Sequence, residues 1–215
     1  MFKSLLLSLL LVSVWVGEFD HVDAHGKMMK PPNRSSIWRV PEFSNQNPPA
    51  NYNDNELYCG AIHQVDDPGS NCGVCGDPQA QSTPRDNEVN GRWYRGIIVG
   101  DYTRGQNIDI EIDLNAAHLG AMEWRLCTNP ATENQACFNN HLLQLTSGGT
   151  KLYVTQGPGF YRTQATLPSG VTCEHCILQW NYRGGNQYGD CGNGTSGLGC
   201  GPQETFRGCA DVRIR

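Results

Sequence analysis

The ten cysteines of this 215-residue chain constrain its fold more than any other feature. Their number is even, and none precedes residue 59. In an oxidising compartment such a set predicts up to five disulfides and a loop-rich domain held together by them. The spacing does not fix the connectivity, although Cys127 and Cys137, neighbours across a short loop, form the most favoured single pair. The ten are Cys59, Cys72, Cys75, Cys127, Cys137, Cys173, Cys176, Cys191, Cys200 and Cys209.

Two Cys-x-x-Cys pairs, Cys72/Cys75 and Cys173/Cys176, also have the form of zinc half-sites. About a hundred residues separate the two pairs, far more than the usual zinc spacing. No βαβ pattern surrounds either pair, as a thioredoxin-like redox site requires. The disulfide interpretation is therefore preferred for all four cysteines.

The first 24 residues have the pattern of a secretory signal peptide. Lys3 gives a positive start, and the apolar run over residues 5–16 is too short to span a bilayer. Val22-Asp23-Ala24 places modest or small side chains at the positions that signal peptidase reads. We therefore expect cleavage after Ala24 and secretion to the extracellular space.

The mature chain, residues 25–215, has the length of one domain. It carries 15 basic and 18 acidic side chains and has no basic patch or run. This balance argues against nucleic acid and anionic membranes as partners, and we expect a monomer.

Short β-strands dominate the expected secondary structure. Residues 108–114 (Ile-Asp-Ile-Glu-Ile-Asp-Leu) alternate apolar and acidic side chains, which predicts a strand with one buried and one wet face. Residues 30–90 are rich in Pro, Asn, Asp and Cys, which predicts a long disulfide-pinned loop region with a short helical turn. About seven strands between Gly/Pro/Asn turns favour an all-β antiparallel sandwich. The further strands are expected at 93–99, 121–127, 151–155, 161–167, 176–182 and 206–214.

Two histidines are candidate metal ligands. After cleavage, His25 offers both an α-amino nitrogen and an imidazole, and His118 follows the alternating strand. If the two meet, three nitrogens surround one ion, a donor set that suits Cu(II) best. No cysteine is needed as a ligand, because all ten can be oxidised. Taken singly, a histidine after a cleavage site or at a strand end is more often structural.

Four segments carry a resemblance to a known family: the mature start His25-Gly26-Lys27-Met28-Met29-Lys30-Pro31-Pro32-Asn33-Arg34-Ser35-Ser36, the cysteine-rich pieces Tyr58-Cys59-Gly60 and Cys72-Gly73-Val74-Cys75-Gly76-Asp77, the strand end Ala116-Ala117-His118, and the C-terminal stretch over residues 199–212 (GCGPQETFRGCADV). Together they resemble the lytic polysaccharide monooxygenases, most of all auxiliary-activity family fifteen, with family ten as a more distant relative. The resemblance spans the mature chain in the right order and implies an immunoglobulin-like or fibronectin-like sandwich.

The resemblance also implies a set of site residues. His25 would bind copper through its α-amino nitrogen and Nδ1, and His118 through Nε2. Phe206 would occupy the place beside the axial copper position, where it offers no oxygen ligand. The methyl group of Ala116 would crowd the other axial side. For Phe206 and Ala116 the alternative is plain core packing.

The implied activity is oxidative cleavage of glycosidic bonds in an insoluble β-1,4-linked polysaccharide, with chitin as first choice and cellulose as second. It uses one copper ion, dioxygen or hydrogen peroxide as co-substrate, and an external reductant as electron donor. Two alternatives remain. A hydrolytic glycosidase needs two carboxylates across the scissile bond, for which Glu204 and Asp211 are candidates although no motif singles them out. A non-catalytic chitin- or carbohydrate-binding protein would not need a free N-terminal histidine.

Other polar and aromatic residues have simpler expected roles. We expect Arg34 to fix the N-terminal segment by hydrogen bonds. Sequons at Asn33 and Asn193 are candidate glycan sites. Exposed aromatic rings in the loop region can stack on sugars, although packing is the more common role of such rings. They are Trp38, Tyr52 and Tyr58.

Overall fold

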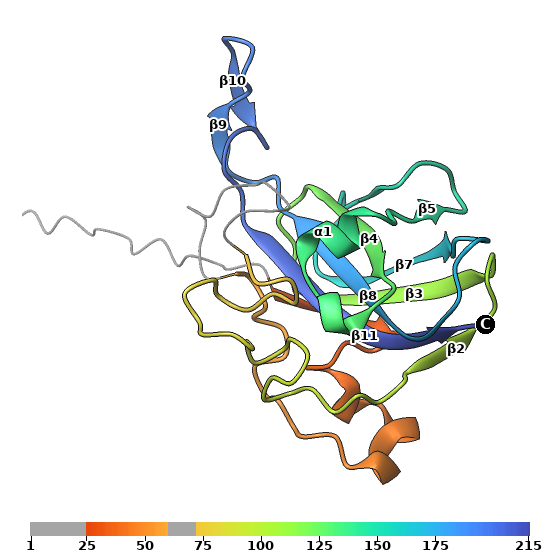
Figure 1. Cartoon of the computed structure of the whole chain (residues 1–215). Helices are drawn as coiled ribbons and strands as arrows, with labels where there is room; N and C mark the ends of the chain where they lie inside the picture. The colour runs from red at the N-terminus through yellow and green to blue at the C-terminus, as the bar shows by residue number, and fades with distance from the viewer. Residues whose placement is uncertain (1–24, 60–71) are drawn as a thin grey trace, which may run out of the picture.

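Two β-sheets pack face to face in the computed structural model, which describes residues 25–59 and 72–215 (Figure 1). The expected signal peptide, residues 1–24, lies outside the described residues. The four-stranded sheet has the order β1 (His25–Lys30), β3 (Asn107–Ala116), β7 (Gly159–Thr166), β5 (Gln144–Leu145). The five-stranded sheet has the order β2 (Gly100–Tyr102), β11 (Thr205–Ile214), β8 (Cys173–Arg183), β4 (Ala121–Cys127), β6 (Leu152–Tyr153). The predicted antiparallel sandwich is confirmed, with one exception: β2 runs parallel to β11.

The core lies between the sheets and is built on the alternation read in β3. Ile108, Ile110, Ile112 and Leu114 are at most 1% exposed. They pack in one cluster with side chains from the facing sheet, among them the fully buried Trp180. Burying one such aliphatic side chain contributes about 2 kcal/mol, so this strand anchors the sandwich.

The opposite face of β3 is paired rather than simply solvated. Lys30 lies 2.8 Å from Asp109, and Arg162 lies 2.6 Å from Glu111. Lys27 of β1 similarly lies 3.1 Å from Asp113. The acidic stripe therefore meets basic side chains from both neighbouring strands.

The loop region between β1 and β2 is fastened along one edge of β11. Arg34 N donates to Cys209 O at 2.8 Å, and Arg207 N donates to Leu57 O at 3.0 Å. This region contains the expected helical turns, as two 3₁₀ helices, η1 (Ile37–Arg39) and η2 (Pro41–Gln46).

The strand predicted at 93–99 is wrong. Those residues form turns and irregular backbone, and β2 begins only at Gly100. The loop region already occupies the upstream edge of β11, so this segment finds no free strand edge there. Gly96, with φ of 63°, also interrupts an extended backbone.

All ten cysteines are paired, so the zinc interpretation of the Cys-x-x-Cys motifs is wrong. The predicted Cys127–Cys137 disulfide is confirmed. The longest link joins the loop region to β11 through Cys75 and Cys209, 134 residues apart. The others are Cys59–Cys72, Cys173–Cys176 and Cys191–Cys200.

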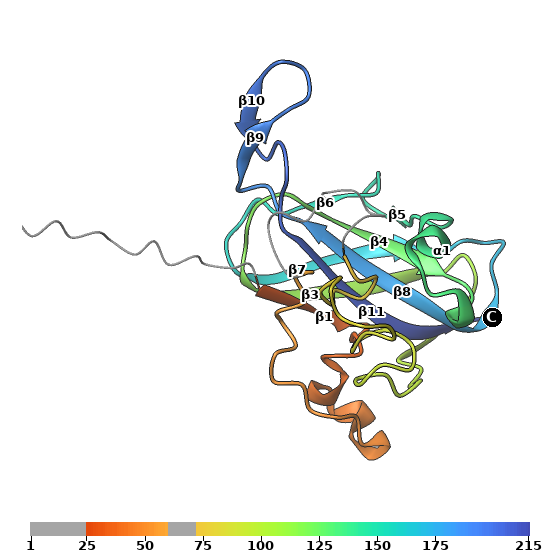
Figure 2. The same cartoon turned by 60° about the vertical axis from the view of Figure 1, so that its left-hand side comes forward.

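A hairpin of β9 (Tyr188–Asp190) and β10 (Ser196–Leu198) projects from the body of the sandwich in both views (Figures 1 and 2). After β4, the chain forms η3 (Pro130–Thr132) and the short helix α1 (Gln135–Asn139). Within the described residues, no helix has the length and apolar character needed to cross a membrane.

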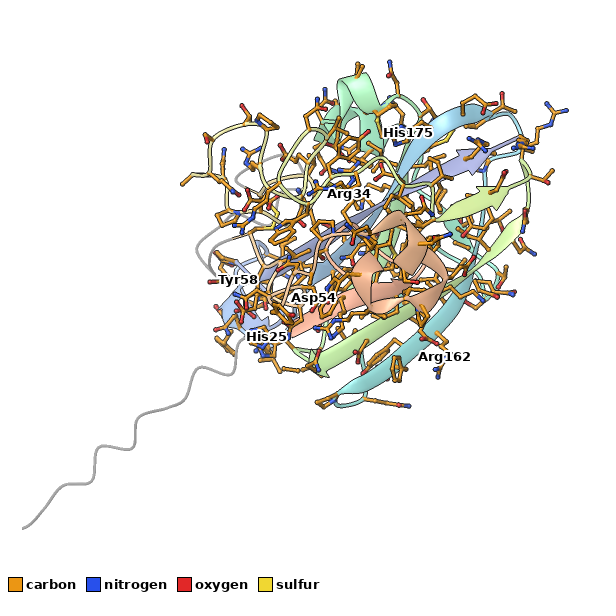
Figure 3. All side chains as sticks on the ribbon, turned by 90° about the horizontal axis from the view of Figure 1, so that it is seen from below. His25, Arg34, Asp54, Tyr58, Arg162 and His175 are labelled. Carbon is orange, nitrogen blue, oxygen red and sulfur yellow. A yellow bond between two sulfur atoms is a disulfide. The ribbon has the colours of Figure 1, made fainter. Side chains whose placement is uncertain are left out.

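Arg34 has the structural role that the sequence predicts, as the centre of a buried charge cluster. Its guanidinium makes two hydrogen bonds to Asp211, at 2.7 and 2.8 Å, and one to Glu133 at 2.6 Å. It also donates to Asn87 O at 2.8 Å, and its side chain is 3% exposed. Arg34 and His175, which also contacts Asp211, are neighbours in Figure 3. The cluster ties the N-terminal segment to β11.

Replacing Arg34 with Met should lower the free energy of unfolding by about 3–5 kcal/mol, because two buried carboxylates lose their cation. Arg162→Met is the matched control: it removes an ion pair of an exposed guanidinium and should cost less than about 1 kcal/mol. Urea denaturation with the disulfides intact measures both. Equal losses in the two variants would contradict the role given to Arg34.

Candidate metal centre

His25 begins β1 at one edge of the molecule, where Figure 3 labels it. Its backbone lies opposite Ala116 of β3, and Gly26 N donates to Asn55 O at 3.0 Å. The imidazole is 29% exposed, and its Nε2 lies 4.0 Å from Glu56 Oε1. The other ring nitrogen, Nδ1, belongs to the same residue as the α-nitrogen, and a histidine with a free amine can offer both to one ion.

Gly26 allows this placement because no larger residue fits after His25. A Cβ atom at Gly26 would collide with the side chain of Leu114 and lie 3.3 Å from the ring of Trp180. Glycine therefore lets the start of β1 lie directly on the core, which fixes the position of His25 in front of it.

His118 lies two residues past the end of β3 and is held on three sides. Its backbone N donates to Tyr182 Oη at 2.9 Å, and its carbonyl accepts from Gly185 N at 2.7 Å. Its Nδ1 lies 2.6 Å from Glu204 Oε2. A carboxylate accepts hydrogen bonds, so Nδ1 carries the proton and Nε2 keeps the free lone pair that a metal requires.

Tyr182 makes two hydrogen bonds to the backbone around His118. Its hydroxyl accepts from His118 N and donates to Leu119 O at 2.7 Å. Burial raises the pKa of this phenol, so the hydroxyl stays protonated and keeps its donor. The backbone on both sides of the His118 carbonyl is thereby fixed.

The β1–β3 register sets the two histidines at the same end of the sandwich. His25 is the cross-strand partner of Ala116, and His118 is two residues farther along. His118 lies beyond the last paired position of β3, just past the point where β1 begins opposite Ala116. Both imidazoles therefore lie at the same end of the sandwich, as a shared metal site requires.

Phe206 and Ala116 lie beside this end of the sandwich. Phe206 is fully buried, with its ring centroid 5.7 Å from that of Tyr182 and 6.3 Å from that of Tyr58. Tyr58 follows by two residues Glu56, whose carboxylate lies 4.0 Å from His25 Nε2. Ala116 is half-buried opposite His25. The structure therefore brings all four predicted site residues to one region, around a phenylalanine that offers no oxygen.

The nitrogen donors fit copper. Amine plus imidazole nitrogens suit Cu(II), and no thiolate competes because all ten cysteines are in disulfides. Cys75, Glu133 and Cys209 also approach one another, but the two sulfur atoms are bonded together and Glu133 binds Arg34. That second cluster is structural.

The two carboxylates considered for a hydrolase are both engaged elsewhere. Glu204 and Asp211 are each 3% exposed and bind His118 and Arg34, respectively. Neither carboxylate is available at the surface, where both would have to flank a scissile bond.

A family model described as lytic polysaccharide mono-oxygenase, cellulose-degrading, matches residues 25–212. The chain belongs to this family. It is accordingly a copper-dependent polysaccharide monooxygenase, and the family uses dioxygen or hydrogen peroxide together with a reductant.

One solved structure of a lytic polysaccharide monooxygenase supports the assignment, and two more distant structures are also similar to the chain. An AA15 enzyme from Thermobia domestica, solved in the Cu(I) state, is 45% identical over 88% of this chain and 98% of its own, with a TM-score of 0.80. An AA10 enzyme from Streptomyces lividans is 18% identical over 88% and 99%, with a TM-score of 0.46. A chitin binding domain from Burkholderia pseudomallei is 14% identical over 90% and 100%, with a TM-score of 0.47. No protein of curated function matches the chain.

Sequence reasoning missed the residues that support the histidines. Glu204 was considered as a hydrolytic acid, whereas it fixes the His118 ring. The available signal was its position just before β11 and two residues before Phe206, because residues two apart along a strand share a face. Tyr182 and Glu56 gave no comparable signal, because their contacts depend on which strands pair.

Replacing Glu204 with Ala should lower the copper affinity of the mature lytic polysaccharide monooxygenase about 10–100-fold, because the His118 ring loses the partner that orients it. Glu204→Gln keeps an acceptor oxygen and should lose less. Competition titration with a copper chelator measures both, with His118→Ala as the reference for loss of a ligand. An unchanged affinity in Glu204→Ala would contradict this role.

Proposed function

We propose that the mature protein is a secreted monooxygenase that holds one copper ion with His25 and His118 and cleaves an insoluble β-1,4-linked polysaccharide. The α-amino nitrogen and Nδ1 of His25 and Nε2 of His118 are the proposed ligands. The observation that supports the proposal is the β1–β3 register, which sets His25 opposite Ala116, two residues before His118, together with the contact of Glu204 with His118 Nδ1, which leaves Nε2 free for a metal.

Copper, once reduced, supplies the activation of dioxygen or hydrogen peroxide that leads to hydroxylation at C1 or C4 of a sugar and breakage of the bond. The residues of this chain prepare the site. An α-amino group ordinarily has a pKa of about 7.7–8.0, so the amine of His25 would give up its proton on binding metal. Ala116 would limit access to the ion from its side, and Phe206 would offer it no oxygen ligand.

A projecting hairpin next to an edge site suits a substrate that cannot enter a pocket. The β9–β10 hairpin starts just after Gly185, which is hydrogen-bonded to His118. Its cross-strand pair Tyr188 and Leu198 is 72% and 61% exposed. An aromatic ring and an aliphatic side chain can pack on the apolar face of a sugar ring. Chitin is the proposed first substrate, from the resemblance to family fifteen, and cellulose, named in the description of the matched family, is the second.

The aromatic rings of the loop region contribute unequally. Tyr58 packs on Phe206, and Trp38 packs edge-on against Tyr52 with ring centroids 5.2 Å apart. Tyr52 is 79% exposed and remains open to a sugar ring. Packing accounts for the other two.

Mass spectrometry of products from chitin and from cellulose, with copper and ascorbate, tests the function. We expect oxidised oligosaccharides that require both additives. Adding one residue ahead of His25 should abolish them by converting the α-amine to an amide, while binding to the polysaccharide persists. Unoxidised products without copper would indicate a hydrolase, and binding without any cleavage a non-catalytic protein.

Phe206→Tyr tests whether residue 206 lies beside the metal. A phenol oxygen beside the ion should change the electron paramagnetic resonance spectrum of the Cu(II) protein, because phenylalanine offers no ligand atom there. Phe138→Tyr, at another fully buried phenylalanine, is the control and should leave the spectrum unchanged. An unchanged spectrum in Phe206→Tyr would place residue 206 away from the metal.

A further inference from the structure

We propose that Asn193, at the tip of the β9–β10 hairpin, carries an N-linked glycan, and that Asn33, in the other sequon, stays unmodified in the folded protein. The inference rests on the proposed secretion, because this modification takes place in the secretory pathway. Both sequences satisfy Asn-x-Ser/Thr, as Asn33-Arg34-Ser35 and Asn193-Gly194-Thr195. The structure separates the two.

The Asn193 sequon lies in a turn that can accept a large substituent. The turn joins β9 to β10, and all residues from 191 to 195 are exposed. Asn193 Oδ1 accepts from Thr195 N at 3.1 Å and from Thr195 Oγ1 at 2.6 Å. The Nδ2 atom, the acceptor in the reaction, makes no hydrogen bond to the described residues and can take a sugar without losing a contact.

The hairpin is rigid enough to keep this tip away from the body. The Cys191–Cys200 disulfide ties the turn end of β9 to the chain that follows β10, and Cys191 N donates to Thr195 O at 2.9 Å across the turn. Gly192 and Gly194 have φ values of 78° and 81°, which glycine adopts without strain. The tip conformation is therefore fixed by the chain itself and needs no support from neighbouring loops.

Asn33 has the opposite environment. Its side chain is 0% exposed, its Oδ1 is bound by Ser36 Oγ, and its Nδ2 faces Gly208, where even a Cβ atom would collide with it. The next residue, Arg34, donates its backbone N–H to Cys209 of β11. A sugar on Asn33 Nδ2 would thus occupy the space of β11 and keep the N-terminal segment from closing. Because the transfer occurs before folding is complete, only chains unmodified at Asn33 reach this fold.

The transfer is a substitution at an anomeric carbon. The donor is an oligosaccharide carried on a polyprenyl diphosphate. A bond forms from Asn193 Nδ2 to the anomeric carbon, the bond from that carbon to the diphosphate oxygen breaks, and Nδ2 loses one proton. No electrons are exchanged, so no redox partner is needed.

The position keeps the glycan clear of the proposed substrate contacts. Along the hairpin, the pair nearest the turn is Asp190 with Ser196, and the pair farthest from it is Tyr188 with Leu198. The connection to His118 is beyond that second pair. A glycan on the turn therefore extends away from the metal end and leaves the exposed Tyr188 available.

The test is expression of the full chain with its own leader in a eukaryotic secretory host, followed by intact mass measurement before and after treatment with peptide N-glycosidase in ¹⁸O water. We expect the secreted protein to begin at His25, to carry one glycan, and to gain labelled Asp at position 193 on release. Asn193→Gln and Thr195→Ala should lose the whole glycan mass, and Thr195→Ser should keep it. Ser35→Ala removes the other sequon and should leave the mass of the glycan unchanged.

Two results would overturn the site. A secreted protein that begins at His25 with Asn193 unmodified, or with the glycan on Asn33, would refute it while leaving the proposed function intact. A chain retained in the cytosol with its leader attached and no glycan would refute both the proposed secretion and this site.

Discussion

The pairing of β1 with β3 is the interaction on which the proposed metal site depends. It sets His25 opposite Ala116, two residues before His118, and it is held in place by the contact of Gly26 with the core. Since side chains alternate along a strand, a shift of one residue would turn the face of β1 and separate the two imidazoles. The buried aliphatic row of β3 resists such a shift, because it would also expose apolar side chains to water.

The buried charge cluster extends this control from β1 to β11. Burial raises the pKa of Glu133, whereas for Asp211 burial is outweighed by hydrogen bonds from Arg34 and His175, which hold its pKa below the usual range. The two carboxylates therefore contribute in opposite directions to the pH dependence of the free energy of unfolding. Glu133 takes up a proton early as the pH falls, while the stability contributed by Asp211 is lost only when the pH falls through its lowered pKa. Protonation of Glu133 leaves the Arg34 guanidinium paired, because Asp211 remains as its counter-ion.

How much of this was predictable depends on the range of the contacts involved. The alternation over 108–114 and the Cys127–Cys137 disulfide are local, and both were predicted correctly. The Cys75–Cys209 disulfide spans 134 residues and follows only from the loop region folding along β11. The composition of residues 93–99 is typical of a strand. The structure has no strand there, because the loop region already occupies that edge of β11. The two histidines are candidates from their positions in the sequence, and the family resemblance favours them over a structural role, while the bond from Glu204 to His118 depends on how β11 lies beside the end of β3.

In the proposed site, leader cleavage and metal binding are chemically linked. Before cleavage the nitrogen of His25 is a peptide nitrogen, whose lone pair is delocalised into the carbonyl of Ala24 and does not bind copper at neutral pH without losing its proton. Cleavage turns the same atom into an amine, with no change needed in the β1–β3 pairing. His118, Glu204 and Tyr182 are already placed by the fold, so only one ligand is missing from the precursor. The oxidising centre would thus be completed only on the far side of the export membrane, where its substrate lies and where the disulfides that hold β11 can form.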